Sequence, residues 1–386
     1  MAGPLTGITV LDLSSVGPAA RASGWLADYG ADVVKVAPVA GRAGAQITPP
    51  THAYSGGRGT RRIEIDLKAP AGREAFLRLA ERADVVIESF RPGVVDRLGI
   101  GYDEVKSRNP RIVYCSTSGY GQTGPWSQWA GHDLNYLAVS GYLHMTGRAD
   151  DGKPPLPGAT VADSAGGGLH AVAAILAALV HREHAGNGSY LDVSVADGMV
   201  ALMALQVDEH LATGSEPAPA TAPLAGRFAC YDTYRTGDDR WVAVAAIEPR
   251  FWANLCRAVG LEQWIDRQYD ADAQEAIRAD LAGVLANRTR DEWVEALAPQ
   301  DTCVAPVLSV AEAAATPQFG ERGALAEARG ADGVAFRQLA PMLAGAERAA
   351  SYQLPDRSKT DTDAVLAQAG VGADEIAQLR ADGAIG

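Results

Sequence analysis

The chain has 386 residues, of which 47% are hydrophobic and 6% aromatic, and its formal net charge at pH 7 is −13. This length predicts about two domains, and the composition predicts a mostly aliphatic core. The net negative charge argues against a nucleic-acid-binding protein, because a phosphate-neutralising surface needs clustered lysines and arginines. An anionic ligand would have to be held by local donor groups against the global field.

The cysteines and the apolar segments indicate the cellular compartment of the protein. The four cysteines are scattered without a CxxC pair, which is typical of a reducing compartment. The N-terminal residues lack the basic and apolar regions of a signal peptide. The longest apolar stretch, 169–180, has 12 residues, whereas a membrane span needs about 20. We therefore expect a cytoplasmic protein with no membrane partner.

The first third of the chain alternates between β-branched runs and amphipathic stretches. We expect strands over residues 7–13, 32–36, 62–67, 84–88 and 111–115. Helical spacing lies between them, notably over residues 19–29 and 71–83. Alternation of this kind indicates parallel βαβ units, so the predicted fold class is α/β, with a Rossmann-like, doubly wound large domain.

The remaining two thirds predict a helix-rich region, a linker and a smaller α/β domain. Residues 169–183 are the most apolar helix candidate, and residues 213–224 are rich in proline and small residues. A hairpin is expected over 231–234 and 241–247. Helices are then expected over 250–259, 273–286 and 290–297, with a helical tail after about residue 360. The predicted boundaries are a large domain over 1–200, a linker over 201–227, a small domain over 228–325 and a return segment over 326–386.

Three local clusters carry side chains suited to chemistry, namely residues 131–136, 162–168 and 246–249. Asp163 precedes the long apolar helix and has two interpretations. As a structural residue it would be an N-cap, which aspartate often provides. As a functional residue it would lie beside three glycines that let a ligand approach, and beside helix-start N–H groups that stabilise negative charge.

The other two clusters also allow both a structural and a functional interpretation when the residues are taken alone. His132 suits either a structural histidine or an acid/base group, and Glu248 either a surface strand end or a catalytic carboxylate. Sequence spacing does not link the three clusters. No GxGxxG follows the first strand, which argues against a dinucleotide site.

Six motifs, taken in order, give the chain a resemblance to the type III CoA-transferase superfamily over nearly its whole length. They are Gly3–Gly7 with Val10–Leu13, Ala27–Val36, Ile65–Lys68, Arg91–Val94, Ser118–Pro125 and Thr362–Leu366.

Within that superfamily, the Gly131–Tyr136 segment resembles the α-methylacyl-CoA racemase branch. This resemblance implies that His132 and Asp163 are the catalytic acid/base pair and that Glu248 assists the histidine. Transferase members usually lack that histidine, and their matching aspartate is the nucleophile that carries the acyl group and then CoA. The aspartate alone does not separate the two activities, whereas His132 with Glu248 favours the racemase.

The resemblance also implies an interlocked homodimer and a set of CoA contacts. Each chain would have a Rossmann-like large domain and a small domain, with the partner's small domain closing the site. The implied CoA-binding residues are Ile65, Asp66, Leu67, Lys68, Arg91, Gly131, Asp133, Leu134, Asn135 and Tyr136. Family members often carry an arginine where this chain has Ala37, and Arg42 or Arg58 are candidates to replace it.

The implied reaction inverts the α-carbon of a 2-methylacyl-CoA thioester through an enolate. Histidine titrates near neutrality and a desolvated aspartate can have its pKa raised toward that range, so the two groups can exchange acid and base roles. No metal or redox cofactor is required, and CoA enters as part of the substrate. The alternatives are a CoA-transferase that uses Asp163 as nucleophile and a non-catalytic acyl-CoA-binding protein. The sequence does not identify the acyl group of the substrate.

Overall fold

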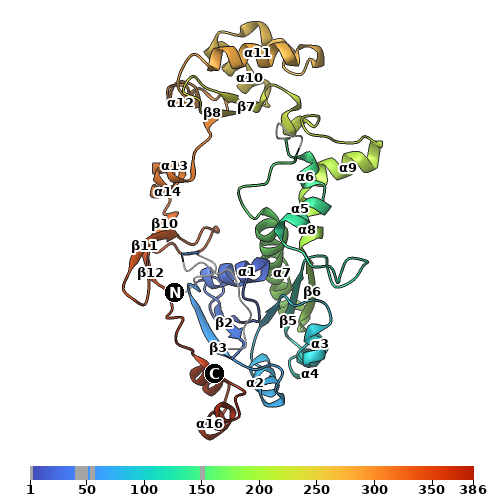
Figure 1. Ribbon diagram of the computed structural model, residues 1–386, viewed down its shortest axis with the longest axis vertical. Helices are drawn as coiled ribbons and strands as arrows, with labels where there is room; N and C mark the ends of the chain where they lie inside the picture. The colour runs from blue at the N-terminus through green and yellow to red at the C-terminus, as the bar shows by residue number, and fades with distance from the viewer. Residues whose placement is uncertain (1–2, 40–50, 53–56, 148–152) are drawn as a thin grey trace. The chain divides into compact units, whose positions relative to one another are not determined.

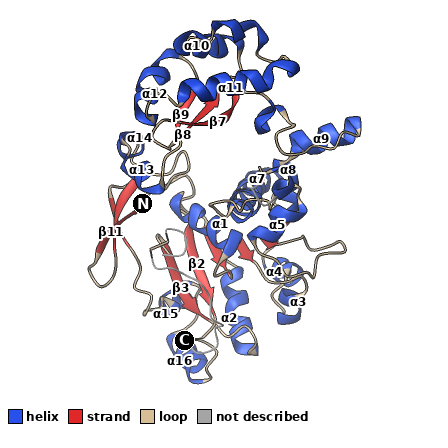
Figure 2. Ribbon diagram, turned by 45° about the horizontal axis from the view of Figure 1, so that its top comes forward, coloured by secondary structure: helices blue, strands red, loops and turns tan. Residues whose placement is uncertain are grey.

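The computed structural model describes residues 3–39, 51–52, 57–147 and 153–386, which form two compact units. The first unit comprises residues 1–140, 157–203 and 317–386, and the second comprises 141–156 and 204–316. Segment 141–156, which the sequence analysis placed in the large domain, groups with the second unit. The first unit contains the large parallel sheet, and the second contains a small antiparallel sheet (Figures 1 and 2).

The large sheet has six parallel strands in the order β3-β2-β1-β4-β5-β6, the order of a Rossmann sheet. The strands are β1 (Thr9–Asp12), β2 (Asp32–Ala37), β3 (Thr60–Glu64), β4 (Val85–Glu88), β5 (Val113–Ser118) and β6 (Ser189–Ser194). The α/β class and the first five strands confirm the prediction. Strand β6 was not predicted; it lies at the edge of the sheet, and only Val193 and Ser194 of its six residues are buried.

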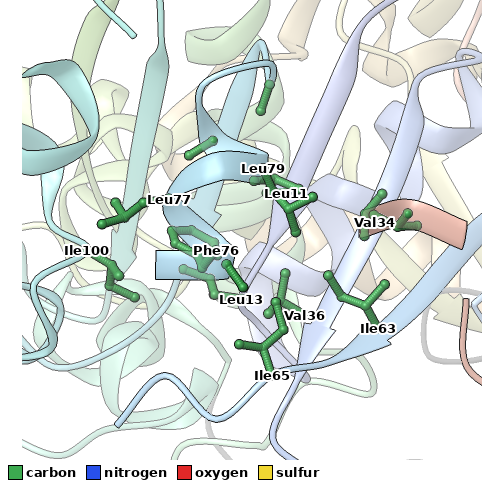
Figure 3. Packing of buried hydrophobic residues seen from close by; sticks show 14 of the residues in the cluster. Leu11, Leu13, Val34, Val36, Ile63, Ile65, Phe76, Leu77, Leu79 and Ile100 are labelled. Carbon is green, nitrogen blue, oxygen red and sulfur yellow. The ribbon is translucent and has the colours of Figure 1, made fainter. Parts of the chain in front are cut away.

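Neighbouring residues of each inner strand enter two different cores, because successive side chains of a strand point to opposite faces. One core takes Leu11, Val34 and Ile63 from the strands and packs them against helix α2 (Pro70–Ala80) (Figure 3). The same core takes residues of α4 (Tyr102–Arg108), α15 (Thr362–Gln368) and α16 (Ala373–Ala381). The C-terminal tail therefore packs on the large sheet.

The opposite core is built from the alternate strand residues and from two helices. It takes Val10, Val33 and Val85 from the strands and packs them against α1 (Gly17–Asp28) and α7 (His170–Ala185). A π-helical segment, η1 (Ala162–Leu169), runs directly into α7. Together they make a 24-residue helix that is long and apolar enough to cross a membrane by length and composition. Its buried face packs against the sheet in this core.

The first unit also contains four short helices and a second sheet. Short helices are α3 (Val94–Leu98), α5 (Asp133–Val139), α8 (Val195–Leu202) and α14 (Pro317–Glu321). A second, three-stranded sheet has the order β11-β10-β12, with β10 (Leu325–Arg329), β11 (Ala335–Leu339) and β12 (Ser351–Gln353). Its strands were not predicted, since they are short and mostly exposed.

The second unit is a three-stranded antiparallel sheet covered by helices, as the hairpin pattern predicts. Its strands are β7 (Tyr231–Arg235), β8 (Trp241–Ala245) and β9 (Val304–Pro306). Its α-helices are α6 (Tyr142–Met145), α9 (Ala204–Thr213), α10 (Pro249–Val259), α11 (Gln274–Leu285), α12 (Arg290–Leu297) and α13 (Val310–Ala315). Four short segments complete it, η2 (Pro223–Arg227), η3 (Glu262–Arg267), η4 (Ala271–Ala273) and η5 (Ala298–Gln300). Helix α9 lies within residues 201–227, the predicted linker, and it meets the proline-rich stretch 213–224 only at Thr213.

Candidate active site

A cavity of about 610 Å³ opens at the carboxyl ends of β1, β2 and β3. Ligands of open parallel sheets bind at this edge, beside the strand where the order reverses. Its walls come from the segments that follow the three strands and from residues near the C-terminus. The lining residues include Lys35, Ala37, Arg62, Ile65, Asp66, Leu67, Lys68, Phe90 and Arg357. Four of the predicted CoA contacts, 65–68, therefore share one cavity.

Basic side chains line this cavity although the chain as a whole is acidic. Lys35 is held by an ion pair with the buried Asp12, and Arg62 lies 2.5 Å from Glu64. Partial desolvation and the positive charge of Arg62 lower the pKa of Arg357. Two guanidinium groups that repel each other at a cavity wall form a suitable site for an anion such as a phosphate.

These arginines could replace the arginine that family members often carry where this chain has Ala37. Arg58, one of the two candidate replacements, does not line the cavity; both of its outer nitrogens and Nε contact Asp28, Tyr352 or the Leu339 carbonyl. The other candidate, Arg42, lies outside the described residues. Arg62 and Arg357 are therefore the arginines that the structure places at this wall.

The remaining predicted CoA contacts do not line the cavity. Arg91 is exposed in the loop that follows β4, next to the cavity residue Phe90. Residues 131–136 form the start of α5 instead. There the Asn135 side-chain oxygen accepts from the His132 N–H at 3.0 Å, and the Tyr136 hydroxyl donates to the Gly131 carbonyl at 2.6 Å. These contacts fix the backbone on both sides of the exposed His132 side chain.

Asp163 lies inside η1 rather than before a helix, so the N-cap interpretation is wrong. The residue at the N-cap is Val161, and Asp163 directs its carboxylate to Arg21 of α1, with Oδ2 and Nη1 3.2 Å apart. Burial raises the pKa of the Asp163 carboxyl, while the positive charge of Arg21 acts in the opposite direction. Single π-helical turns within longer helices often occur at functional sites.

The three glycines of η1 serve helix packing and do not face a ligand. A Cβ on Gly167 would lie 2.5 Å from Pro18 Cβ of α1, and one on Gly166 would lie 3.0 Å from the Val195 carbonyl oxygen of α8. The backbone donors here are also occupied. The Asp163 N–H donates to Asp133 Oδ1 at 2.9 Å, and the Ser164 N–H donates to the Thr160 carbonyl at 3.1 Å. Neither is therefore a free donor for a developing oxyanion.

The structure brings His132 and Asp163 into one site through Asp133. The carboxyl of Asp133 binds the Asp163 backbone, and His132 is close enough to Asp163 that its positive charge lowers the pKa of that carboxyl. An imidazole and a carboxyl group so placed can act as paired acid and base. Among the described residues, no group of three or more His, Cys, Asp or Glu side chains is arranged to hold a metal ion.

Glu248 belongs to the second unit. It is the N-cap residue of α10, follows β8 by three residues and is exposed. Its side chain makes no capping hydrogen bond, so its carboxylate is not committed to the helix terminus.

Sequence reasoning missed Arg21, which the structure places on Asp163. It is 6% exposed and stands among the buried small residues Ala19, Ala20 and Ala22 of α1. An arginine surrounded by buried alanines is the signal that could have identified it, because a buried guanidinium needs an anionic partner.

Comparison with known proteins gives the chain close relatives along nearly its full length. The sequence profile of CoA-transferase family III matches residues 5–357. Human α-methylacyl-CoA racemase is 34% identical over 379 residues, covering 98% of this chain and 96% of that protein. The probable fatty acyl-CoA transferase Rv3272 of Mycobacterium tuberculosis is 35% identical over 357 residues, covering 86% and 89%. The crystal structure of a CAIB/BAIF family protein from Brucella suis aligns with a TM-score of 0.77 at 29% identity, covering 96% and 100%.

Proposed function

Because the chain belongs to CoA-transferase family III and is thus an enzyme that acts on acyl-CoA thioesters, we propose that it is a racemase of 2-methylacyl-CoA esters. The observation that carries the proposal is the Asp163 N–H, which donates to Asp133 Oδ1 at 2.9 Å and so holds Asp163 beside the segment that begins with His132. A transferase needs only the carboxylate, whereas inversion of a carbon centre needs a second acid/base group.

The reaction proceeds by two proton transfers on opposite faces of the α-carbon. The Asp163 carboxylate takes the α-proton and becomes a carboxylic acid, and the electron pair of the C–H bond delocalises onto the thioester oxygen as an enolate. The His132 imidazolium then gives its proton to the other face and becomes neutral imidazole. For the substrate of opposite hand the two residues exchange roles.

The cavity at the carboxyl ends of β1–β3 takes the nucleotide portion of CoA. Its position at the sheet edge, the predicted contacts 65–68 and the arginines Arg62 and Arg357 support this assignment. The residues of the α5 start, from Gly131 to Tyr136, then lie along the thioester end of the substrate. CoA is substrate here, and the two-base chemistry needs no further cofactor. A cytoplasmic location is part of this proposal and agrees with four free thiols.

The active enzyme is an interlocked homodimer. Large apolar side chains stand exposed on four helical segments: Leu169 at the end of η1, Val180 on α7, Val200 and Leu202 on α8, and Leu205 and Leu211 on α9. Leu211 is 75% exposed, and α9 buries none of its residues in the single chain. Apolar faces of this extent mark interaction sites.

Light scattering after gel filtration should give twice the mass of one chain. The double variant Leu205→Glu, Leu211→Glu should shift the measured mass toward that of one chain. A monomeric native enzyme would contradict the proposed dimer.

The test of the racemase is isotope exchange. In deuterated buffer, a single enantiomer of a 2-methylacyl-CoA should gain deuterium at its α-carbon and lose optical purity. His132→Asn should slow this exchange by about 10²–10⁴. His184→Asn, which changes an exposed histidine in the last turn of α7, is the matched control and should retain the native rate.

A CoA-transferase is the second candidate, favoured by the 35% identity with a probable fatty acyl-CoA transferase. There the Asp163 carboxylate would attack the thioester carbonyl, expel CoA thiolate and form a mixed anhydride that a second carboxylic acid then opens. This enzyme would give a hydroxylamine-sensitive adduct at Asp163 and depend on a second acid. His132→Asn would then have little effect, and the α-carbon would keep its hydrogen.

A further inference from the structure

Arg21 makes contacts that the proposed reaction does not yet use. Its Nη1 lies 3.2 Å from Asp163 Oδ2, and its Nη2 donates to the Thr160 side-chain oxygen at 2.7 Å. One guanidinium thus joins the π-helical residue Asp163 to the segment just before it. This two-point contact limits the rotamers of the Asp163 carboxyl as well as its electrostatic surroundings.

The pair is built into the packing of α1 against η1. Only 7% of the Arg21 side chain and 17% of the Asp163 side chain are exposed. A Cβ on Gly168 would lie 2.9 Å from the Trp25 ring and 3.3 Å from Arg21 Cβ, so this glycine allows the two helices to approach. Because arginine stays protonated at all ordinary pH values, its burial favours an ionised partner.

Other charged groups also surround Asp163. From α5, the negative charge of Asp133 raises the pKa of the Asp163 carboxyl, and the charge of His132 lowers it. Burial and the charge of Asp163 raise the pKa of the Tyr136 hydroxyl on α5. Asp197 of α8 is exposed, and Asp192 of β6 accepts from the Gln122 N–H. His170, the first residue of α7, is exposed. Arg21 is the cation that directly contacts the carboxylate.

We propose that Arg21 is a positioning residue that keeps Asp163 in its carboxylate form, so that the resting enzyme carries the mobile proton on His132. The inference rests on the proposed racemase and specifies its resting state. A two-base enzyme must start with one group protonated and the other not. Burial and Asp133 together would favour a protonated Asp163, and the ion pair with Arg21 opposes that preference.

The test is the pH dependence of kcat/KM for racemisation, whose acid limb reports the group that must be ionised in the free enzyme. Arg21→Gln keeps a donor toward Thr160 but removes the charge, and it should move the acid limb upward by about one pH unit or more. Arg21→Lys keeps the charge and should restore the limb to near its native position. An Arg21→Gln enzyme that is slower at every pH, with an unmoved acid limb, would overturn the proposal.

A matched control separates charge from packing. Arg58 forms a second enclosed ion pair with the same helix, with its Nη2 2.8 Å from Asp28 Oδ2 and side chains 10% and 7% exposed. Arg58→Gln therefore loosens α1 in a comparable way without touching Asp163. It should leave the acid limb in place, and a shift equal to that of Arg21→Gln would show that helix packing, not the charge of Arg21, sets it.

A second measurement is independent of activity, so that failure of the racemase and failure of this inference can be told apart. Melting temperatures of the native chain, Arg21→Gln, Asp163→Asn and the double variant form a cycle. At pH 8 the loss caused by Arg21→Gln should be several degrees smaller in the Asp163→Asn background. The difference should vanish at acid pH, where protonated Asp163 no longer attracts a cation. Additive effects at pH 8 would overturn the ion pair even if racemisation occurs, and coupling without racemisation would reject the proposed function alone.

Discussion

The cavity at the carboxyl ends of β1–β3 and the His132–Asp163 site differ in how they are built. The cavity is formed by segments that directly follow three adjacent strands, and its predicted contacts 65–68 are consecutive in the chain. The His132–Asp163 site is formed where α1, α5 and η1 approach each other. Its central contact joins Arg21 to Asp163, 142 residues apart in the sequence.

This difference indicates that substrate binding and proton transfer have different structural requirements, although both regions lie in the first unit. A binding cavity at a parallel sheet edge follows from topology, because all strand ends meet there. An acid/base site needs individual side chains held in set protonation states, which depend on tertiary partners such as Arg21 and Asp133. We therefore expect substitutions in the two regions to affect different measured quantities.

The largest expected effect is on turnover. Asp163→Asn keeps the size of the side chain but cannot accept a proton at ordinary pH, so α-proton exchange should fall by about 10²–10⁴. The affinity for CoA, measured by calorimetry with CoA alone, should stay within about twofold of native, because Asp163 does not line the sheet-edge cavity. Asp103→Asn, an exposed change on α4, is the control for loss of one negative charge.

An Asp163→Asn enzyme that exchanges deuterium normally would refute the two-base assignment. If Asp163→Asn instead lowered the affinity for CoA as much as it lowered turnover, the two regions would not have separate roles in binding and chemistry.

The sequence alone predicts the fold well where side-chain periodicity is strong. The inner strands β1, β2, β4 and β5 are buried on both faces and give continuous apolar runs, whereas the edge strand β6 and the exposed strands β10–β12 give none. Helix α9 lies within the predicted linker 201–227, and none of its residues is buried within the chain.

The site is less predictable for a related reason. The motif at 131–136 and Asp163 can be found from their local sequence, but the partners that set their charge come from elsewhere in the chain. Nothing near Arg21 in the sequence indicates Asp163, and the glycines 166–168 look like a ligand loop although they pack against α1 and α8. Local sequence gives the residue types, and tertiary contacts decide their roles.

The second prediction concerns stability at the end of β4, two residues before the cavity residue Phe90. Glu88 ends β4, is 2% exposed and accepts from the Phe90 N–H at 2.7 Å. Burial raises the pKa of Glu88 to about 7. The folded protein therefore keeps this carboxyl protonated while the unfolded chain ionises it above about pH 4.5. Stability is lost between about pH 4.5 and 7, by about 3 kcal/mol, and the loss is complete above pH 7.

Glu88→Gln keeps an acceptor for the Phe90 N–H and cannot ionise, so it should remove this slope. The measurement is the free energy of unfolding in urea at pH 5 and pH 8, compared between native protein and variant. Glu275→Gln changes an exposed residue of α11 and is the control. Parallel pH profiles for native protein and Glu88→Gln would mean that Glu88 is already ionised in the folded state.

The smallest expected effect tests the cavity directly. Lys68 is exposed at the cavity rim, so its charge acts on a bound phosphate through solvent, and Lys68→Ala should weaken CoA binding by several-fold, at most about tenfold. The loss should shrink at 0.5 M salt, because solvent-exposed charges are screened. The turnover of bound substrate should not change, which is the reverse of the pattern expected for Asp163→Asn. Lys106→Ala, on α4 over the Tyr102 ring, removes one positive charge away from the cavity and should leave both quantities unchanged. Equal losses of CoA affinity for Lys68→Ala and Lys106→Ala would mean that only the overall charge of the protein matters. The CoA nucleotide would then bind somewhere other than this cavity.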